Sequence, residues 1–174
     1  MNPEPGGLTV DIGDRETIIA MTGGGRWTIP TGSAHLVETD LENAGHPAPE
    51  HLTNALGTVQ DHLDDVLREA PIVATAPSIE FAGRHALELA YVEIGERTIP
   101  NDYTLDRADV DDVFRTLVAE PSIERVHNPG LDAEHVDTII GTCCVVLGII
   151  RRLDLKTATV TRRPDALRRG NVVA

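Results

Sequence analysis

The stretch Ile139-Ile-Gly-Thr-Cys-Cys-Val-Val-Leu-Gly-Ile-Ile150 is the most apolar part of the chain. Its 12 residues are too few to cross a bilayer, which takes about 20 consecutive apolar residues. Apolar side chains on nearly every side of a helix predict a helix buried at the centre of a fold. We therefore expect the chain to pack around one central helix, predicted over Ala133–Leu153 and capped by Asp132.

Cysteine and histidine give no strong metal-binding signal. Cys143 and Cys144 are adjacent in this stretch, and neighbours on a helix point about 100° apart, so they do not form a chelating pair by themselves. We interpret them as core thiols. The seven histidines are scattered singly, and we interpret them as structural or surface residues. Two pairs are close enough in the sequence to suggest ligands but lack a third ligand at suitable spacing: His46 with His51, and His127 with His135.

The N-terminal part predicts an antiparallel meander. Three β-prone runs, Leu8–Ile12, Glu16–Met21 and Arg26–Ile29, are separated by turn residues. The turns are Gly13-Asp14-Arg15 and Gly23-Gly24-Gly25. We interpret the triple glycine as a plain hairpin turn, the alternative being a loop that cradles phosphate.

The rest of the chain alternates helices with short strands. This order predicts an α/β fold with a mixed sheet and helices on both faces. No linker divides the chain, so we expect a single domain over residues 1–174 with a core over about 8–172. The predicted elements are an amphipathic helix over 52–70, a short buried strand at 72–75, a helix from Pro77 to about Ala90, a polar, turn-rich segment over 94–104, a helix capped by Asp106 and ending by Glu120, and a strand over 158–161.

The net negative charge of the chain restricts the kinds of molecule that it can bind. The formal charge is -13, from 28 acidic against 15 basic residues, and Lys156 is the only lysine. Such an acidic surface predicts a halophilic protein, because high salt screens repulsion between carboxylates. It disfavours nucleic acid and anionic membranes as partners, since phosphate contacts need clustered Lys and Arg. Residues 1–7 do not form a secretory signal, so we expect a cytoplasmic protein.

Four short segments occur in a recognisable order: Val10–Ile18 (V-D-I-G-D-R-E-T-I), Thr28–Glu38, Pro129–Thr142 (P-G-L-D-A-E-H-V-D-T-I-I-G-T), and the closing pair Thr159–Thr161 with Leu167–Gly170. Together they resemble the Ppx/GppA phosphatases (exopolyphosphatase and guanosine pentaphosphate phosphatase) of the actin-like ATPase superfamily. The resemblance implies a ribonuclease-H-like, actin-like domain, corresponding to the second of the two core domains in that family.

The resemblance also implies where ligands would bind. In that family phosphates lie between two similar domains, held by glycine-rich turns and a metal-linked carboxylate. The candidate phosphate or metal residues here are Asp11, Gly13, Thr17 and Arg168. Asp11 would hold Mg²⁺ through water, or alternatively would stabilise its own turn. Arg168 and Arg162 would meet an anion beside that turn, or alternatively are surface charges.

Several features of that site are altered. Asp14 and Arg15 replace two glycines of the first turn, and Ile18 replaces a glutamate. Backbone N–H groups bind anions only where the chain approaches closely, which is why glycine is needed there. We align the second phosphate loop with Ala74–Ile79, which has no glycine and contains Pro77.

These losses predict a binding or regulatory protein without catalytic activity, which pairs with itself or with a chain that supplies the missing domain. The family's first domain, with its catalytic glutamate, does not fit within 174 residues. One alternative is a split or minimal exopolyphosphatase or guanosine pentaphosphate phosphohydrolase completed by a partner. Another is a nucleotide or phosphate sensor. No nucleophile elbow or Walker-type loop suggests a different enzyme.

Overall fold

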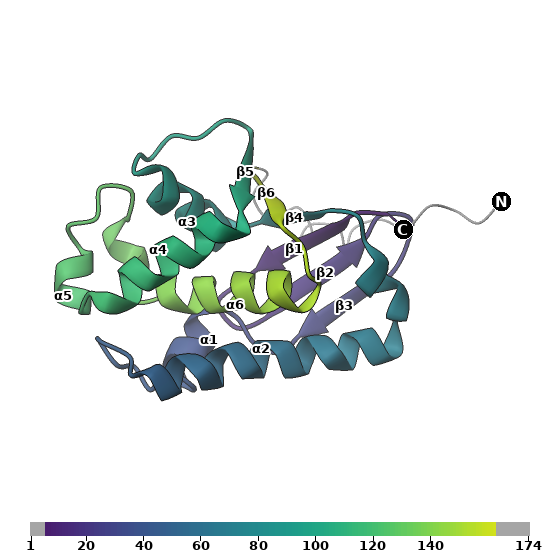
Figure 1. Ribbon diagram of the computed structural model, residues 1–174, viewed down its shortest axis with the longest axis horizontal. Coiled ribbons are helices and arrows are strands. Elements are labelled where there is room, and N and C mark those ends of the chain that lie inside the picture. Colours follow the sequence, from purple (N-terminus) through teal and green to yellow (C-terminus); the bar gives the residue numbers. More distant parts are fainter. Residues whose placement is uncertain (1–5, 163–174) are drawn as a thin grey trace.

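The computed structural model describes residues 6–162, whose six strands form one mixed sheet in the order β3-β2-β1-β4-β6-β5 (Figure 1). The predicted N-terminal meander is confirmed, and so is the α/β class with a mixed sheet. The two central pairings, β1 with β4 and β4 with β6, are parallel, and β5 pairs antiparallel with β6. The strands are β1 (Leu8–Ile12), β2 (Thr17–Met21), β3 (Arg26–Ile29), β4 (Ile79–Ala82), β5 (Asp102–Asp106) and β6 (Thr157–Thr161).

The predicted central helix is confirmed as α6, in which every residue from Ile139 to Ile150 is buried. It packs against α1, α2, α3 and α4. None of the helices described over residues 6–162 has the length and hydrophobicity needed to span a membrane. The helices are α1 (Ser33–Glu38), α2 (Pro49–Glu69), α3 (Arg84–Ile94), α4 (Arg107–Ala119), α5 (Ser122–Arg125) and α6 (Ile139–Arg152), with 3₁₀ helices η1 (Pro71–Thr75) and η2 (Ala133–His135).

The described helices gather on one side of the sheet (Figure 1). The chain passes from β3 through α1 and α2 to β4, and from β4 through α3, β5, α4 and α6 to β6, so both connections advance in the same direction along the sheet. Right-handed crossovers in one direction place their helices on one face. Val10 and Phe81 are fully buried on this face, whereas Thr9 and Glu80 on the other are only partly buried. The expected helices on both faces are therefore not found within residues 6–162.

Two predicted elements between residues 70 and 90 were wrong. The segment 72–75 is a 3₁₀ helix rather than a buried strand, and Ile72 in it is 53% exposed. The helix predicted from Pro77 is instead strand β4 followed, after Gly83, by α3. Only the paired strands β1 and β6 on either side make residues 79–82 a strand, and such pairing cannot be seen in the local pattern.

Two predicted caps also differ. Asp132 accepts a hydrogen bond from the Glu134 amide and so caps the 3₁₀ helix η2, while α6 begins only at Ile139. Asp106 stands at the N-cap of α4 and also ends strand β5, and its side chain makes no capping hydrogen bond. That strand lies partly in the segment predicted to be turn-rich.

Candidate functional site

The candidate site lies where two turns meet at the carboxyl edge of the sheet. Strands β1 and β4 are parallel neighbours, so the turn after β1 and the turn before α3 lie side by side. Between them is an open cavity of about 520 Å³ lined by residues 11–16 and 83–85. Open α/β sheets bind ligands in crevices at the carboxyl ends of their strands.

Gly83 brings the second turn against Asp11. Its φ of +94° is in a region that favours glycine, and a Cβ there would lie 2.8 Å from Asp11 Oδ1. Asp11 is only 1% exposed, so its carboxylate is enclosed at this end of β1. The sequence alignment of the second loop with Ala74–Ile79 was therefore wrong: the turn opposite Asp11 is at Gly83, and it retains a glycine.

The first turn is fastened to helix α1 by backbone hydrogen bonds. The Gly13 amide donates to the Glu16 carbonyl at 3.0 Å, which closes the β1–β2 hairpin. The Gly13 carbonyl accepts from the Ser33 amide, and the Asp14 carbonyl accepts from the His35 amide, both at 2.9 Å. Because the Gly13 N–H is used within the hairpin, it is not directed at a ligand in this conformation.

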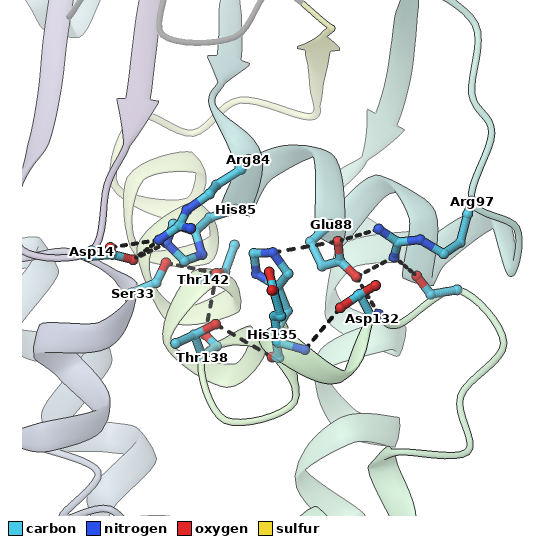
Figure 2. A network of polar contacts seen from close by, with 12 residues as sticks. Asp14, Ser33, Arg84, His85, Glu88, Arg97, Asp132, His135, Thr138 and Thr142 are labelled. Carbon is cyan, nitrogen blue, oxygen red and sulfur yellow. Dashed lines mark hydrogen bonds and ion pairs between the residues drawn. The ribbon is translucent and has the colours of Figure 1, made fainter.

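The carboxylate of Asp14 lies beside the first turn of α3 (Figure 2). It accepts hydrogen bonds from Arg84 Nη2 at 2.7 and 2.9 Å, and its Oδ1 lies 2.6 Å from His85 Nε2. Burial alone would raise the pKa of Asp14, but the hydrogen bonds from His85 and Arg84 outweigh it, so the pKa is below 3.8. The start of a helix attracts negative charge, and here the chain supplies that charge itself.

A buried polar network continues inward from Asp14 (Figure 2). The ring of His85, 1% exposed, meets the ring of His135 edge to face with 5.3 Å between centroids. Burial lowers the pKa of His85 more than Asp14 raises it, because the imidazolium is poorly solvated. His135 Nε2 in turn lies 3.9 Å from Glu88 Oε2.

Glu88 fastens α3 to the loop that precedes η2. Its carboxylate, 2% exposed, accepts from both Arg97 Nη atoms at 2.5 and 3.1 Å and from the Asp132 amide at 2.6 Å. Arg97 also donates to the Gly130 carbonyl at 3.0 Å. The segment Pro129–Thr142 is thus attached to α3 through a buried ion pair.

Comparison with known proteins identifies the fold but not the site. No protein-family profile matches the sequence, and no curated protein matches it either. Solved structures do match: an exopolyphosphatase-like protein has a TM-score of 0.81 at 18% identity, over 92% of this chain and 56% of that one. A Ppx/GppA family member from Aquifex aeolicus has a TM-score of 0.77 at 19% identity, over 92% and 53%. This chain has a Ppx/GppA-like fold.

The Ppx/GppA-like chain spans only about half the length of the proteins it matches. An exopolyphosphatase from Cytophaga hutchinsonii shows the same relation, with a TM-score of 0.70 at 16% identity over 90% of this chain and 53% of that one. Identities this low show the fold and do not transfer activity. The function must be argued from the residues of the candidate site.

The sequence-predicted residues of the Ppx/GppA-like site separate into two groups. Asp11 and Gly13 line the cavity. Thr17 does not, because it is fully buried and its hydroxyl donates to the Thr31 carbonyl at 2.9 Å. Arg162 directly follows β6 at the same edge of the sheet, but its guanidinium donates to the Ile99 carbonyl at 3.4 Å. Arg168 lies outside the described residues.

At the candidate site, a single enclosed carboxylate is suited to Mg²⁺, and no full set of protein ligands surrounds it within residues 6–162. Asp11 is the enclosed carboxylate at the cavity, and Mg²⁺ commonly binds one or two carboxylates while keeping several waters. Within residues 6–162 no group of three or more His, Cys, Asp or Glu is arranged to hold a metal ion. Cys143 and Cys144 are buried, and burial raises the pKa of Cys143 to about 12, which supports their interpretation as core thiols.

Sequence reasoning missed three of the residues at the candidate site. Arg84, His85 and Glu88 all belong to α3, whose start was placed seven residues too early, at Pro77. The only local signal was Gly83, because glycine is common in turns between two elements. His135 packs against His85, which agrees with its interpretation as a structural residue.

Proposed function

We propose that this chain is a non-catalytic Ppx/GppA-like domain that serves as a binding or regulatory module. One observation carries the proposal: the carboxylate of Asp14 occupies the basic side of the cavity, bound to Arg84 and His85. A phosphate entering there would meet a negative charge and would have to displace an ion pair. Such a site is suited to holding two turns together rather than to binding phosphate.

We further propose that the domain pairs with a second copy of itself or with another chain. The resemblance to Ppx/GppA proteins implies that ligands lie between two similar domains, and this chain spans 53–56% of the solved structures it matches. The cavity edge formed by residues 11–16 and 83–85 is open, which suits it to contact with another domain. Light scattering in molar KCl tests this, and a strictly monomeric protein with no co-purifying chain would contradict the pairing.

The catalytic part is tested by hydrolysis of polyphosphate and guanosine pentaphosphate in molar KCl with Mg²⁺. The high salt suits the acidic composition. We expect no turnover above background, and the same background for Asp11→Ala. Turnover by the wild-type protein that is lost in Asp11→Ala would contradict the non-catalytic proposal.

The position of Asp11 favours one second candidate, a hydrolase completed by a partner chain. Asp11 is enclosed at the cavity, and Gly83 leaves room for its carboxylate. In that case Asp11 would hold Mg²⁺ through water, and the partner would supply the missing phosphate loop and carboxylate. Activity that appears only after the protein assembles with that partner, and is lost in Asp11→Ala, would favour this candidate.

The third candidate is a sensor that binds nucleotides or phosphate, because basic side chains line the cavity. Arg15 and Arg84 both line it and are more than half exposed, with side-chain exposures of 63% and 64%. Each already has a carboxylate partner, Glu38 for Arg15 and Asp14 for Arg84, which weakens this candidate. Calorimetric titration with nucleotides and polyphosphate decides it: absence of heat at millimolar ligand removes the sensor.

A further inference from the structure

A row of buried side chains crosses the sheet on the face that carries no helices. Successive side chains of a strand point to opposite faces, so the register partners Asp11, Ile18 and Ala82 lie on the face opposite Val10. All three are at most 4% exposed. Thr161 continues the row on β6, by the parallel register of β4 with β6, and is 1% exposed. The buried row therefore spans four strands at their end next to the cavity.

Within residues 6–162, no helix or strand covers this row. The helices gather on the other face of the sheet (Figure 1). The turn at Gly83 touches Asp11, but β4 lies two strands away from β2, or about 10 Å, so this turn does not bury Ile18. Side chains on an uncovered sheet face stay in contact with water. The burial of Ile18 therefore requires a covering segment, and that segment belongs to the same chain, because this is the burial of one chain by itself.

The degree of burial shows where the cover lies. The neighbouring row on the same face, farther from the cavity, contains Thr9, Ala20 and Glu80, which are only half-buried. On the edge strands of this face, Thr28 and Thr104 are exposed. The cover thus extends over the four inner strands at the end next to the cavity.

Two segments of the chain lie outside the described residues, 1–5 and 163–174. Residues 1–5 join β1 at the end away from the buried row, and they include two prolines and the acidic Glu4. Residues 163–174 follow Arg162 directly after β6, at the end where the row lies. They can span at most about 40 Å, whereas β6 and β2 are three strand spacings or about 14 Å apart. The second segment therefore starts in the right place and is long enough.

The composition of residues 163–174 suits the buried row and its surroundings. Their largest apolar side chain is Leu167, which can exclude water from Ile18. They also contain three arginines and one aspartate. The carboxylates next to the row include Asp11 and Glu16, which line the cavity. Basic side chains stabilise carboxylates at such a partly enclosed position.

We propose that residues 163–174 lie across the helix-free face at the end next to the cavity, with Leu167 over Ile18 and the arginines beside Asp11 and Glu16. The segment acts as a built-in cover of this face. A partner that needs the face has to displace the segment first, which lowers its apparent affinity. The inference goes beyond the proposed function and does not depend on whether the domain is catalytic.

The test places a nitroxide spin label on an Asn171→Cys variant of the full chain. The native Cys143 and Cys144 are buried, and burial raises the pKa of both thiols, so they do not react with the label. In NMR spectra the label should broaden the amide signal of Ile18 and leave the signals of α2, on the other face, sharp. A label on Asp61→Cys, which is exposed on α2, is the matched control and should do the reverse.

A second variant removes the apolar contact. Leu167→Asp should release the segment, because a carboxylate is not stable against an apolar side chain, and the broadening of the Ile18 signal should be lost. A cysteine at the half-buried Ala20→Cys position should then react with maleimide about tenfold faster, because its cover has opened. Thr104→Cys, exposed on the same face, should react equally fast with and without Leu167→Asp. Leu167→Met, which keeps the apolar contact, should preserve the broadening.

Three results would overturn the inference. The first is equal broadening, or none, of the Ile18 and α2 signals by the label at position 171. The second is broadening of Ile18 that arises between labelled and unlabelled copies in a mixed sample, which would assign the cover to a second copy. The third is unchanged broadening in a natively folded Leu167→Asp variant. If Leu167→Asp does not fold, the label at position 171 decides. Hydrolysis of polyphosphate tests the non-catalytic proposal separately, so either proposal can fail while the other stands.

Discussion

Asp14 Oδ1 and His85 Nε2 lie 2.6 Å apart and join the turn after β1 to the first turn of α3. The contact orients the buried ring of His85, which in turn packs against His135. It also places a carboxylate on the basic side of the cavity, next to Arg84. One side chain thus connects two turns that are distant in the sequence, and we expect its charge to exclude external anions from them.

Removing this carboxylate is expected to open the cavity to anions. In Asp14→Ala, Arg84 and His85 lose their acceptor, so pyrophosphate should bind measurably in calorimetry where the wild-type protein shows no heat. The free energy of unfolding should fall by about 1–3 kcal/mol, because the Nε2 atom of the buried His85 is left without a partner. Asp112→Ala, which removes the exposed partner of Arg115, is the matched control and should change neither quantity. An Asp14→Ala protein that binds no pyrophosphate would show that Asp14 does not fill an anion site.

The burial of His85 is expected to make stability depend on pH. Its pKa in the folded protein is below the ordinary 6.5, so the unfolded chain takes up a proton first as the pH falls. The stability from His85 is therefore complete above about pH 6.5 and declines as the pH falls from 6.5 toward the lower folded pKa. Denaturant midpoints measured between pH 8 and 5 should fall with pH in this window.

His85→Asn should reduce that decline, because asparagine does not titrate. His127→Gln is the control, since His127 is exposed and its replacement should leave the slope as in the wild-type protein. Equal slopes for wild type and His85→Asn would mean that another group is responsible for the acid sensitivity. The lowered pKa of Asp14 does not interfere, because the stability it contributes is lost only at lower pH, below about 3.8.

Elements with a long apolar stretch or with clear turn residues at their ends could be predicted from the sequence. The apolar stretch Ile139–Ile150 predicted a buried central helix, and α6 has all of these residues buried. The glycine turns at residues 13 and 23–25 predicted the meander. The strand β4 could not be predicted in this way, because Pro77-Ser78 resembles a helix start and only pairing with β1 and β6 makes residues 79–82 extended.

The candidate site was predictable only in its first half. Asp11 and Gly13 stand in a recognisable strand and turn, and the structure places both at the cavity. The other half depends on contacts between residues far apart, such as Asp14 with His85 across 71 positions and Glu88 with Asp132 across 44. No periodicity connects such positions, so the sequence alone does not show that they meet.

Two glycines in helices are expected to respond to alanine in opposite directions. Gly141 in α6 packs against the Ser33 carbonyl so closely that an added Cβ would overlap it, so Gly141→Ala should lower the free energy of unfolding by about 1–3 kcal/mol. Gly57 in α2 has no atom within 4 Å of an added Cβ, and Gly57→Ala should raise stability by about 0.5–1 kcal/mol. Thermal unfolding of both variants checks this. Tolerance of Gly141→Ala would contradict the close packing of α6 on α1, and destabilisation by Gly57→Ala would contradict the open space next to that position of α2.

Replacing Arg97 is expected to cost more stability than replacing its partner Glu88. The reason is that the Glu88 side chain is 2% exposed while the Arg97 side chain is 43% exposed. Arg97→Gln leaves a charged carboxylate buried with only the Asp132 amide as a close donor, and should cost about 3 kcal/mol. Glu88→Gln leaves the charge on Arg97, which water can reach, and should cost about 1 kcal/mol.

Denaturant unfolding of both variants, with Arg115→Gln as an exposed control, measures this difference. The control should cost less than about 0.5 kcal/mol, because its partner Asp112 is exposed. The double variant Arg97→Gln, Glu88→Gln should be more stable than Arg97→Gln alone, since it removes the unpaired buried charge. If both single variants cost the same, the burial of Glu88 does not determine the energy of this pair, and the attachment of Pro129–Thr142 to α3 must come from other contacts.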